Sequence, residues 1–413
     1  MNILVIAALW PEPTSSAAGR RMMDLLKLFC EQGWHVTYAC TASESENAYP
    51  LGTLGIKKKS IAINNSSFDI FISKLSPEIV MYDRFMVEEQ FSWRVDKCCP
   101  TAMTILETSD LHCLRYAREA ALKKGAEFMV ADLMSEQAYR EIASIQRTDL
   151  SLIISTAEME LLRAVFKVDA ALIHYFPFMS DPDNNKALMN TWRSFEERNG
   201  FMCIGNFKHA PNWDSVQYLK KTIWPLIREK LPQAELAIYG AYPPSKAMQL
   251  HKPKEGFFVQ GRADNVQEVM EKARVCLAPI RFGAGLKGKL LEAMEYGTPS
   301  VTSAIGAEAM HAELPWNGSV CDDPEEFANA AIELHENKAQ WLDCQQRGSD
   351  ILQQCFLPKT VLPPLLEKID DIRNDLALHR QQNFQGGMLK HHLMRGTKYM
   401  SLWIEEKNKV SDK

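Results

Sequence analysis

The chain is 413 residues long, has 46% hydrophobic and 24% charged residues, and carries a formal net charge of -5. This length favours two domains, each with its own core. The slightly acidic balance argues against a nucleic-acid-binding surface over the chain as a whole, so no nucleic acid is expected as a partner. No apolar run approaches the roughly 20 residues that cross a bilayer.

Ten cysteines are present, none in a Cys-x-x-Cys pair, and several fall in apolar runs. They predict core residues in a reducing compartment and argue against a disulfide framework or a zinc site. The apolar run at residues 1–8 has no basic region before it and breaks at Trp10 and Pro11. It therefore predicts a buried first strand and not a signal peptide, and we expect a cytoplasmic protein.

The first half of the chain alternates short apolar runs with helical stretches. The runs lie at residues 2–8, 35–39, 60–63, 79–82, 102–106 and 152–155. This alternation predicts a doubly wound, mostly parallel sheet. The loop after the first run lacks Gly-x-Gly-x-x-Gly, which argues against a nicotinamide dinucleotide site. Gly19 and Arg20 end that loop, either approaching a phosphate or sugar or simply starting a helix with solvated arginines.

Polar residues follow two of these predicted strands. Asp83 and Arg84 come after one, and Asp110 and His112 after another. Such residues face the ligand crevice of an open α/β sheet. His112 has the chemistry to bind a sugar hydroxyl or to act as acid or base, although a structural histidine is the alternative. The charged helical segment 111–148 is read as a solvated face, with acceptor binding as the alternative.

A second α/β pattern begins at about residue 201. Strands are expected at 201–205, 234–239, 257–259, 275–278 and 300–302, with a helix from Trp213 to about Leu231. The polar, turn-rich stretch 180–185 predicts a linker. We therefore divide the chain into an N-terminal domain at 1–178, a C-terminal domain at 179–370 and a helical extension at 371–413.

The most informative stretch is 278–310. A glycine-rich turn joins a predicted strand to a helix expected at 286–296, and such a turn holds anions at the helix N-terminus. Lys287 and Lys289 stand at that end, where their charge opposes the helix dipole, so a bound anion explains them better than helix stability does. Glu292 lies one turn further on, where a carboxylate accepts hydrogen bonds from sugar hydroxyls.

This stretch reads Arg-x-Gly-x-Gly-x-Lys-x-Lys-x-x-Glu-Ala from Arg281, followed by Gly-x-Pro from Gly297. It resembles the donor site of glycosyltransferases with the GT-B fold, especially family 4. Other matching pieces are Gly205, Pro211, Asn212, Gly240, Gly261 and Arg262, with looser matches at Gly19–Arg20 and Asp110–His112, over about residues 1–370.

The resemblance implies two Rossmann-like, doubly wound α/β domains facing each other across a cleft. It also implies transfer of a sugar from a nucleoside diphosphate sugar to an acceptor, usually with retention. No cofactor is implied, and no metal is expected, because lysines supply the charge and no Asp-x-Asp motif is present. The catalytic residues implied are His112 and Lys287. The donor-binding residues implied are Gly19, Arg20, Arg262, Arg281, Gly285, Leu286, Lys287, Gly288, Lys289 and Glu292.

One departure keeps alternatives open. The family often carries a glutamate eight positions before the second one, and here that position is Ala284. A degenerate nucleotide-binding protein therefore remains an alternative. A sugar-nucleotide epimerase is another, although no acid/base carboxylate pair is evident. The base and sugar of the donor, and whether the acceptor is a glycan, a lipid-linked molecule or a protein, stay open.

The tail beyond about residue 358 begins with a predicted helix near 365–378, which in the family commonly crosses back to the N-terminal domain. Residues 388–395 and 399–403 have a mildly basic, amphipathic character. They predict either a weak peripheral contact with an anionic membrane or a plain surface helix.

Overall fold

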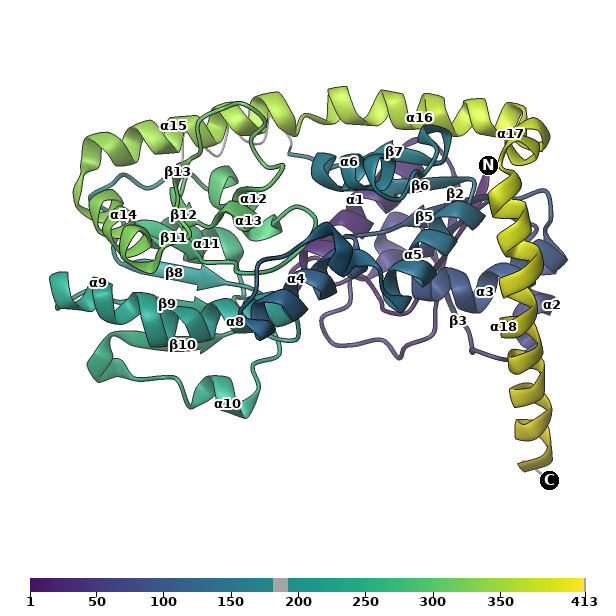
Figure 1. Ribbon diagram of the computed structural model, residues 1–413, viewed down its shortest axis with the longest axis horizontal. Helices are drawn as coiled ribbons and strands as arrows, with labels where there is room; N and C mark the ends of the chain where they lie inside the picture. Colours follow the sequence, from purple (N-terminus) through teal and green to yellow (C-terminus); the bar gives the residue numbers. More distant parts are fainter. Residues whose placement is uncertain (181–191, 412–413) are drawn as a thin grey trace.

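The computed structural model describes residues 1–180 and 192–411. Within them the chain forms two parallel sheets, each with helices on both faces, which lie side by side along the molecule (Figure 1). This confirms the predicted α/β fold with two doubly wound halves. The first sheet has the order β3-β2-β1-β4-β5-β6-β7. Its strands are β1 (Asn2–Ala7), β2 (His35–Cys40), β3 (Lys57–Ser60), β4 (Ile79–Asp83), β5 (Met103–Glu107), β6 (Leu150–Ile153) and β7 (Ile173–Tyr175).

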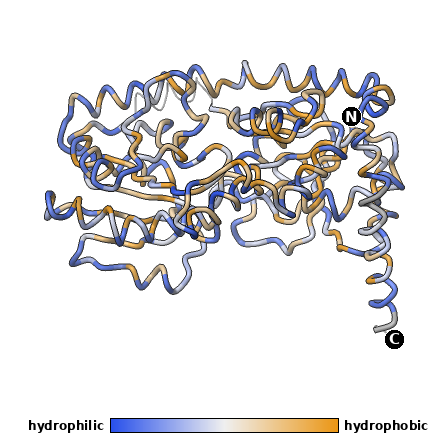
Figure 2. Tube along the Cα trace, in the orientation of Figure 1, coloured by the Kyte–Doolittle hydropathy of each residue, from blue (hydrophilic) through white to orange (hydrophobic). Residues whose placement is uncertain are grey.

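The second sheet has the order β10-β9-β8-β11-β12-β13. Its strands are β8 (Phe201–Ile204), β9 (Leu236–Tyr239), β10 (Phe257–Gly261), β11 (Val275–Ala278), β12 (Ser300–Thr302) and β13 (Gly318–Val320). The central strands are buried along their whole length, as in β4, β5 and β11. Parallel strands that are covered on both faces carry apolar side chains on both faces. These strands therefore appear in the sequence as continuous apolar runs and can be predicted from it. Apolar residues accordingly gather inside both halves (Figure 2).

Helices connect the strands and cover both sheets. Those of the N-terminal half are α1 (Ala17–Glu31), α2 (Ser67–Leu75), α3 (Phe85–Cys98), α4 (His112–Lys124), α5 (Glu136–Arg147) and α6 (Thr156–Ala164), with short turns η1 (Leu51–Leu54), η2 (Val130–Leu133) and η3 (Ala170–Leu172). Those of the C-terminal half are α8 (Ala210–Tyr218), α9 (Trp224–Lys230), α10 (Ser245–Met248), α11 (Val266–Lys272), α12 (Gly288–Glu295), α13 (Ala304–Ala307), α14 (Pro324–Glu336) and α15 (Lys338–Cys355), with the turns η4 (Leu219–Ile223) and η5 (Pro253–Glu255).

Two of the edge strands, β3 and β13, differ from the sequence expectation. The predicted strand at 60–63 is wrong, because β3 occupies Lys57–Ser60 and is exposed throughout. The edge strand β13 has no counterpart among the predicted strands. Neither of these two strands has a fully buried side chain, so the hydrophobic pattern does not reveal them.

The helix expected from Trp213 to Leu231 is interrupted. It starts earlier, at Ala210, and passes through the π-helical turn η4 before α9 resumes it. Pro225 stands at the start of α9 and cannot donate a backbone hydrogen bond. A π turn widens the hydrogen-bonding pattern locally, which accommodates the missing donor.

The tail returns to the first half of the chain. Helix α16 (Pro358–Asn374) continues the line of α15 over both sheets (Figure 1). Its Leu365 and Ile369 pack into the core beneath β1 and α1. Helices α17 (Leu376–Gln382) and α18 (Phe384–Ser411) complete the chain. The predicted linker at 180–185 lies outside the described residues except for Ser180, so the domain boundary there stays a prediction.

Candidate functional site

A cavity of about 530 Å³ lies where the carboxyl ends of the two sheets face each other. The N-terminal half lines it with the loop after β1 and the segments after β4 and β5. The C-terminal half lines it with the segments after β8, β9 and β11 and with the first turn of α12. Open α/β sheets bind ligands at this end of their strands.

The glycine turn before α12 brings the two halves into close contact. Gly285 has a φ of +63°, in the left-handed region that favours glycine. Its N–H donates to Glu158 Oε1 at 2.8 Å, across the domain boundary. A Cβ at Gly285 would lie 2.9 Å from that of Asp110, and one at Gly288 would lie 2.6 Å from that of Ala17. Glycine is therefore required at both positions by the facing domain.

Two lysines flank the start of α12, and both line the cavity. Lys287, the N-cap residue, is 7% exposed, and its Nζ donates to the carbonyl of Gly285 at 2.6 Å. Burial lowers its pKa to about 8. Lys289 Nζ donates to Asn212 Oδ1 at 2.6 Å, and burial lowers its pKa as well. In the part of the chain that the structure describes, neither ammonium group forms an ion pair with a carboxylate.

Glu292 also lines the cavity, one turn into α12. Burial raises its pKa to about 7, although the charge of Arg20 acts in the opposite direction. Arg20 itself does not line the cavity. Its guanidinium binds Glu295 through two hydrogen bonds of 2.6 and 2.8 Å and the carbonyl of Met179 at 3.3 Å. This arginine therefore ties α1 to α12 beneath the site.

The remaining predicted donor residues separate into two groups. Gly19, Leu286 and Arg262 line the cavity, and Arg262 Nη2 donates to Thr14 Oγ1 at 2.8 Å. Arg281 lies outside the lining and is ion-paired with Asp214, with hydrogen bonds of 2.6 and 2.9 Å. Gly285 stands behind the lining, where its N–H is already bound. The donor-binding roles of Arg20, Arg281 and Gly285 stay predictions that this placement does not favour.

His112 lies on the opposite wall, at the start of α4. Its Nε2 is 3.5 Å from Asp110 Oδ1, and its ring stands edge-on to Phe85 and Tyr116. Burial lowers the pKa of the imidazole to about 4, against the attraction of Asp110. The ring is therefore neutral near pH 7 and can both donate and accept a hydrogen bond. Asp110 is itself ion-paired with Arg115.

Several lining residues carried no signal strong enough to be selected from sequence. His209, in the C-terminal half, has its pKa lowered to about 4 by burial. Asn206 reaches across the boundary to the carbonyl of Ser15 at 3.3 Å. The stretch from Asn206 to Asn212 belongs to the part of the sequence that resembles the family, but the sequence did not predict its contacts with Ser15 and Lys289.

Three of the eight described non-glycine residues with positive φ line this cavity. Arg84, Ser109 and Tyr242 have positive φ values of 73°, 62° and 58° and all line it. Non-glycine residues rarely adopt such angles, and those that do cluster at functional sites. The strain therefore supports the assignment of this cavity as the functional site.

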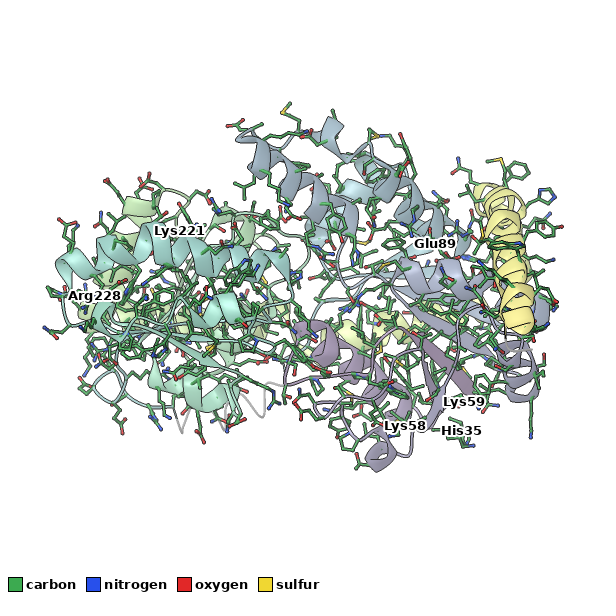
Figure 3. The ribbon with its side chains drawn as sticks, turned by 90° about the horizontal axis from the view of Figure 1, so that it is seen from below. His35, Lys58, Lys59, Glu89, Lys221 and Arg228 are labelled. Atoms are coloured by element: carbon green, nitrogen blue, oxygen red, sulfur yellow. The ribbon has the colours of Figure 1, made fainter. Side chains whose placement is uncertain are left out.

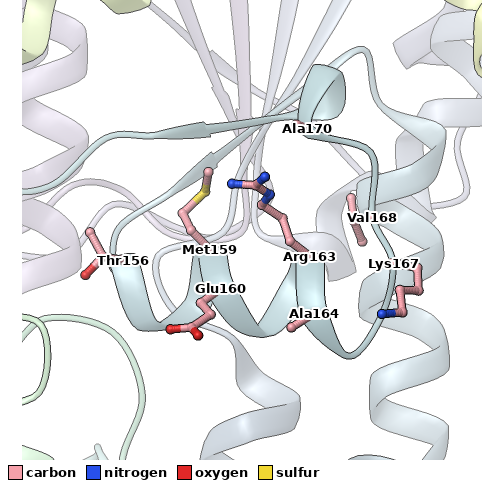
Figure 4. A pocket seen from close by; sticks show the side chains of 8 residues that line it. All are labelled: Thr156, Met159, Glu160, Arg163, Ala164, Lys167, Val168 and Ala170. Carbon is pink, nitrogen blue, oxygen red and sulfur yellow. The ribbon is translucent and has the colours of Figure 1, made fainter.

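A second hollow of about 600 Å³ lies over α6 and the loop that follows it (Figure 4). Arg163, Lys167 and Glu160 are among its lining residues. It contains no residue predicted from the donor motif. Among the described residues, no group of three or more His, Cys, Asp or Glu side chains is arranged to hold a metal ion.

A known family model matches the part of the chain that contains the glycine turn and α12. Residues 198–337 match the family model described as glycosyl transferases group 1. That range contains the second sheet, the glycine turn and α12. No curated protein matches the chain in sequence.

Solved structures match over most of the chain. Sucrose-phosphate synthase from Thermosynechococcus elongatus is 14% identical, with a TM-score of 0.65 over 90% of this chain and 99% of that one. HepE from Anabaena, solved with UDP and glucose, is 12% identical, with a TM-score of 0.65 over 89% and 99%. WaaG, a glycosyltransferase involved in lipopolysaccharide biosynthesis, is 12% identical, with a TM-score of 0.57 over 86% and 95%. At such identities the likeness shows the fold, which is GT-B.

Proposed function

We propose that this chain, a glycosyltransferase with a group 1 domain and the GT-B fold, transfers a sugar from a nucleoside diphosphate donor bound at the start of α12. One observation carries the proposal. Lys287 is a buried cation and Lys289 a half-buried cation in the cavity, and their hydrogen-bond partners are a carbonyl and an amide oxygen. Buried charges are ordinarily paired with an opposite charge. A diphosphate supplies that charge, at a helix N-terminus whose dipole also favours an anion.

The same cations fit the chemical step. When the bond between sugar and donor breaks, negative charge develops on the β-phosphate of the departing nucleoside diphosphate. Fixed ammonium groups in a buried site stabilise that charge without reorganisation. This arrangement needs no metal ion, and we propose that transfer is metal-independent and retains the anomeric configuration.

The other lining residues fit the two ends of such a donor. Glu292 lies one turn beyond the lysines and is suited to bind the ribose hydroxyls, since both its carboxyl and carboxylate forms accept hydrogen bonds. Arg262 also lines the cavity, after β10, and is proposed to lie beside the base. His112, neutral at pH 7, faces the site from the other domain and is suited to bind a hydroxyl of the transferred sugar.

Uridine nucleotides are the first to test. HepE has been solved with UDP and glucose, and a TarM mutant with UDP and alpha-GlcNAc-glycerol. Thermal shift with UDP, GDP and ADP identifies the base, because a ligand that binds the folded state stabilises it according to its concentration over its dissociation constant. Incubation with the corresponding nucleotide sugars then detects transfer or slow donor hydrolysis, in buffer with and without EDTA.

The outcomes separate the alternatives. Transfer or hydrolysis that survives EDTA supports the proposal, and NMR of the anomeric proton reports the configuration of the product. Stabilisation by a nucleotide without turnover of any sugar would instead favour a nucleotide-binding protein. Conversion of one nucleotide sugar into its epimer would favour the epimerase. Absence of binding to all three nucleotides would contradict the proposal.

A further inference from the structure

The last helix, α18, presents one apolar face to solvent while its other face is docked. Figure 1 shows it crossing the end of the N-terminal half and projecting beyond it. On the docked face, Glu405 accepts from the N–H of Ser66 at 3.1 Å and from Arg94 at 3.2 Å. Ser401 is 3% exposed, and Lys390 pairs with Asp96. The helix is therefore fixed in rotation about its axis.

The opposite face carries an outward stripe of large apolar side chains. Its members are 38–78% exposed and are Phe384, Met388, Tyr399, Leu402 and Trp403. At about 100° per residue these positions fall within a sector of about 100°, on one side of the helix. Burial within this chain does not explain the stripe, because the docked face of the same helix supplies its contacts with the body of the protein.

We propose that the outward stripe of α18 binds the surface of an anionic phospholipid membrane. Trp and Tyr are the residues that favour the membrane–water interface, where one side of the ring is apolar and the other wet. Two of the three aromatic residues of the stripe have a lysine over the ring: Lys398 Nζ lies 5.9 Å from the ring centroid of Tyr399, and Lys407 Nζ lies 5.3 Å from that of Trp403. Apolar rings with ammonium groups beside them match acyl chains beneath anionic headgroups.

The charge of this region favours a lipid surface over a second copy of the chain. Residues 384–411 contain five Lys and Arg against two Glu, in a chain whose formal net charge is -5. The edge strand β3 carries the exposed Lys57, Lys58 and Lys59, of which Lys58 is paired with Glu44. Figure 3 places Lys58 and Lys59 toward the same end of the molecule as α18. Two such cationic ends repel each other, whereas an anionic membrane attracts them.

The mode of binding is adsorption in the interface plane. None of the helices in residues 1–180 and 192–411 is long and apolar enough to cross a bilayer. This inference is independent of the proposed donor site, because no residue of α18 lines the cavity.

The test is sedimentation of the full chain with vesicles of phosphatidylcholine containing phosphatidylglycerol, and with vesicles of pure phosphatidylcholine. We expect binding to the anionic vesicles that weakens with added salt, and a loss of about tenfold or more in the double variant Tyr399→Ser, Trp403→Ser. The matched control is Met248→Ser, Leu342→Ser, which removes two comparably exposed apolar side chains from the C-terminal half and should bind as the wild type does.

Circular dichroism and nucleotide thermal shift of the Tyr399/Trp403 variant should match the wild type, because both side chains are exposed. Failure of the wild type to bind the anionic vesicles would overturn the proposal. Equal loss in the Met248/Leu342 control would also overturn it. A concentration-dependent dimer, seen by light scattering and abolished in the Tyr399/Trp403 variant, would assign the stripe to a second copy instead.

Discussion

Glu158 is a buried carboxyl that joins the two halves of the molecule. It lies on α6, is 0% exposed, and accepts hydrogen bonds from the N–H groups of Leu111 at 2.9 Å and Gly285 at 2.8 Å through one oxygen. Burial, together with the nearby charge of Asp110, raises its pKa to about 8. Near pH 7 the group is therefore mostly protonated in the folded protein.

The substitution Glu158→Gln preserves the oxygen that accepts these two bonds and is neutral at every pH. In the unfolded wild type the carboxyl ionises near 4.5, whereas in the folded protein it retains its proton up to about 8. Unfolding thus releases a proton between these values, so the free energy of unfolding of the wild type falls with rising pH relative to the Gln variant. The separation of the two pKa values corresponds to about 5 kcal/mol once pH 8 is passed.

Urea unfolding of both proteins from pH 5 to pH 9 measures this difference, because all other titrating groups are common to the two. We expect the free energy of unfolding of the Gln variant to rise relative to that of the wild type up to about pH 8. Above that pH the difference between the two proteins should stay constant. The control Glu158→Ala leaves two buried N–H groups without an acceptor, at about 1–3 kcal/mol each. The reasoning would be refuted if the unfolding free energy of the Gln variant, relative to that of the wild type, stayed constant or decreased between pH 5 and pH 8.

Three predictions concern the cavity. Lys287→Ala and Lys289→Ala should each lower kcat about 10²–10³-fold, as for loss of an electrostatic donor. The control Lys221→Ala, at an exposed position of η4 (Figure 3), should leave kcat unchanged. Equal rates in all three variants would exclude a role for the charge of Lys287 and Lys289. Glu292→Gln should raise the donor KM about 10–100-fold with little change in kcat, and an unchanged KM argues against ribose binding. Because the pKa of His112 is lowered to about 4, the loss of kcat/KM that belongs to this residue should appear only as pH falls toward 4, and a step near 6.5 that disappears in His112→Asn would show the imidazole titrating normally.

The sequence predicted most of the fold because the central strands are apolar on both faces. The runs at Ile79–Asp83 and Val275–Ala278 lie within a residue of their predicted ends. It failed at the edge strand β3, where Lys57–Ser60 pairs through its backbone while its side chains face solvent. Strand pairing there depends on the neighbouring strand β2 and not on the pattern of the segment itself.

The site was predictable in its local part only. The glycines, lysines and glutamate around α12 follow one another in sequence, and their spacing alone places them at one helix end. Arg20 and Arg281 were expected at the donor, yet their partners are Glu295 and Asp214, which are 275 and 67 positions away. Local pattern contains no information on such pairs, since only the folded chain brings them together.

The glycine turn before α12 is held in place by residues of the N-terminal half of the chain. Glu158 holds the N–H of Gly285, and Arg118 donates to the carbonyl of Gly283 at 2.9 Å while it pairs with Glu308. All these contacts run from the N-terminal half to the C-terminal half. Gly288 allows the approach, because any side chain there would collide with α1. The glycine spacing that resembles a phosphate site is thus also a requirement of the contact between the two halves.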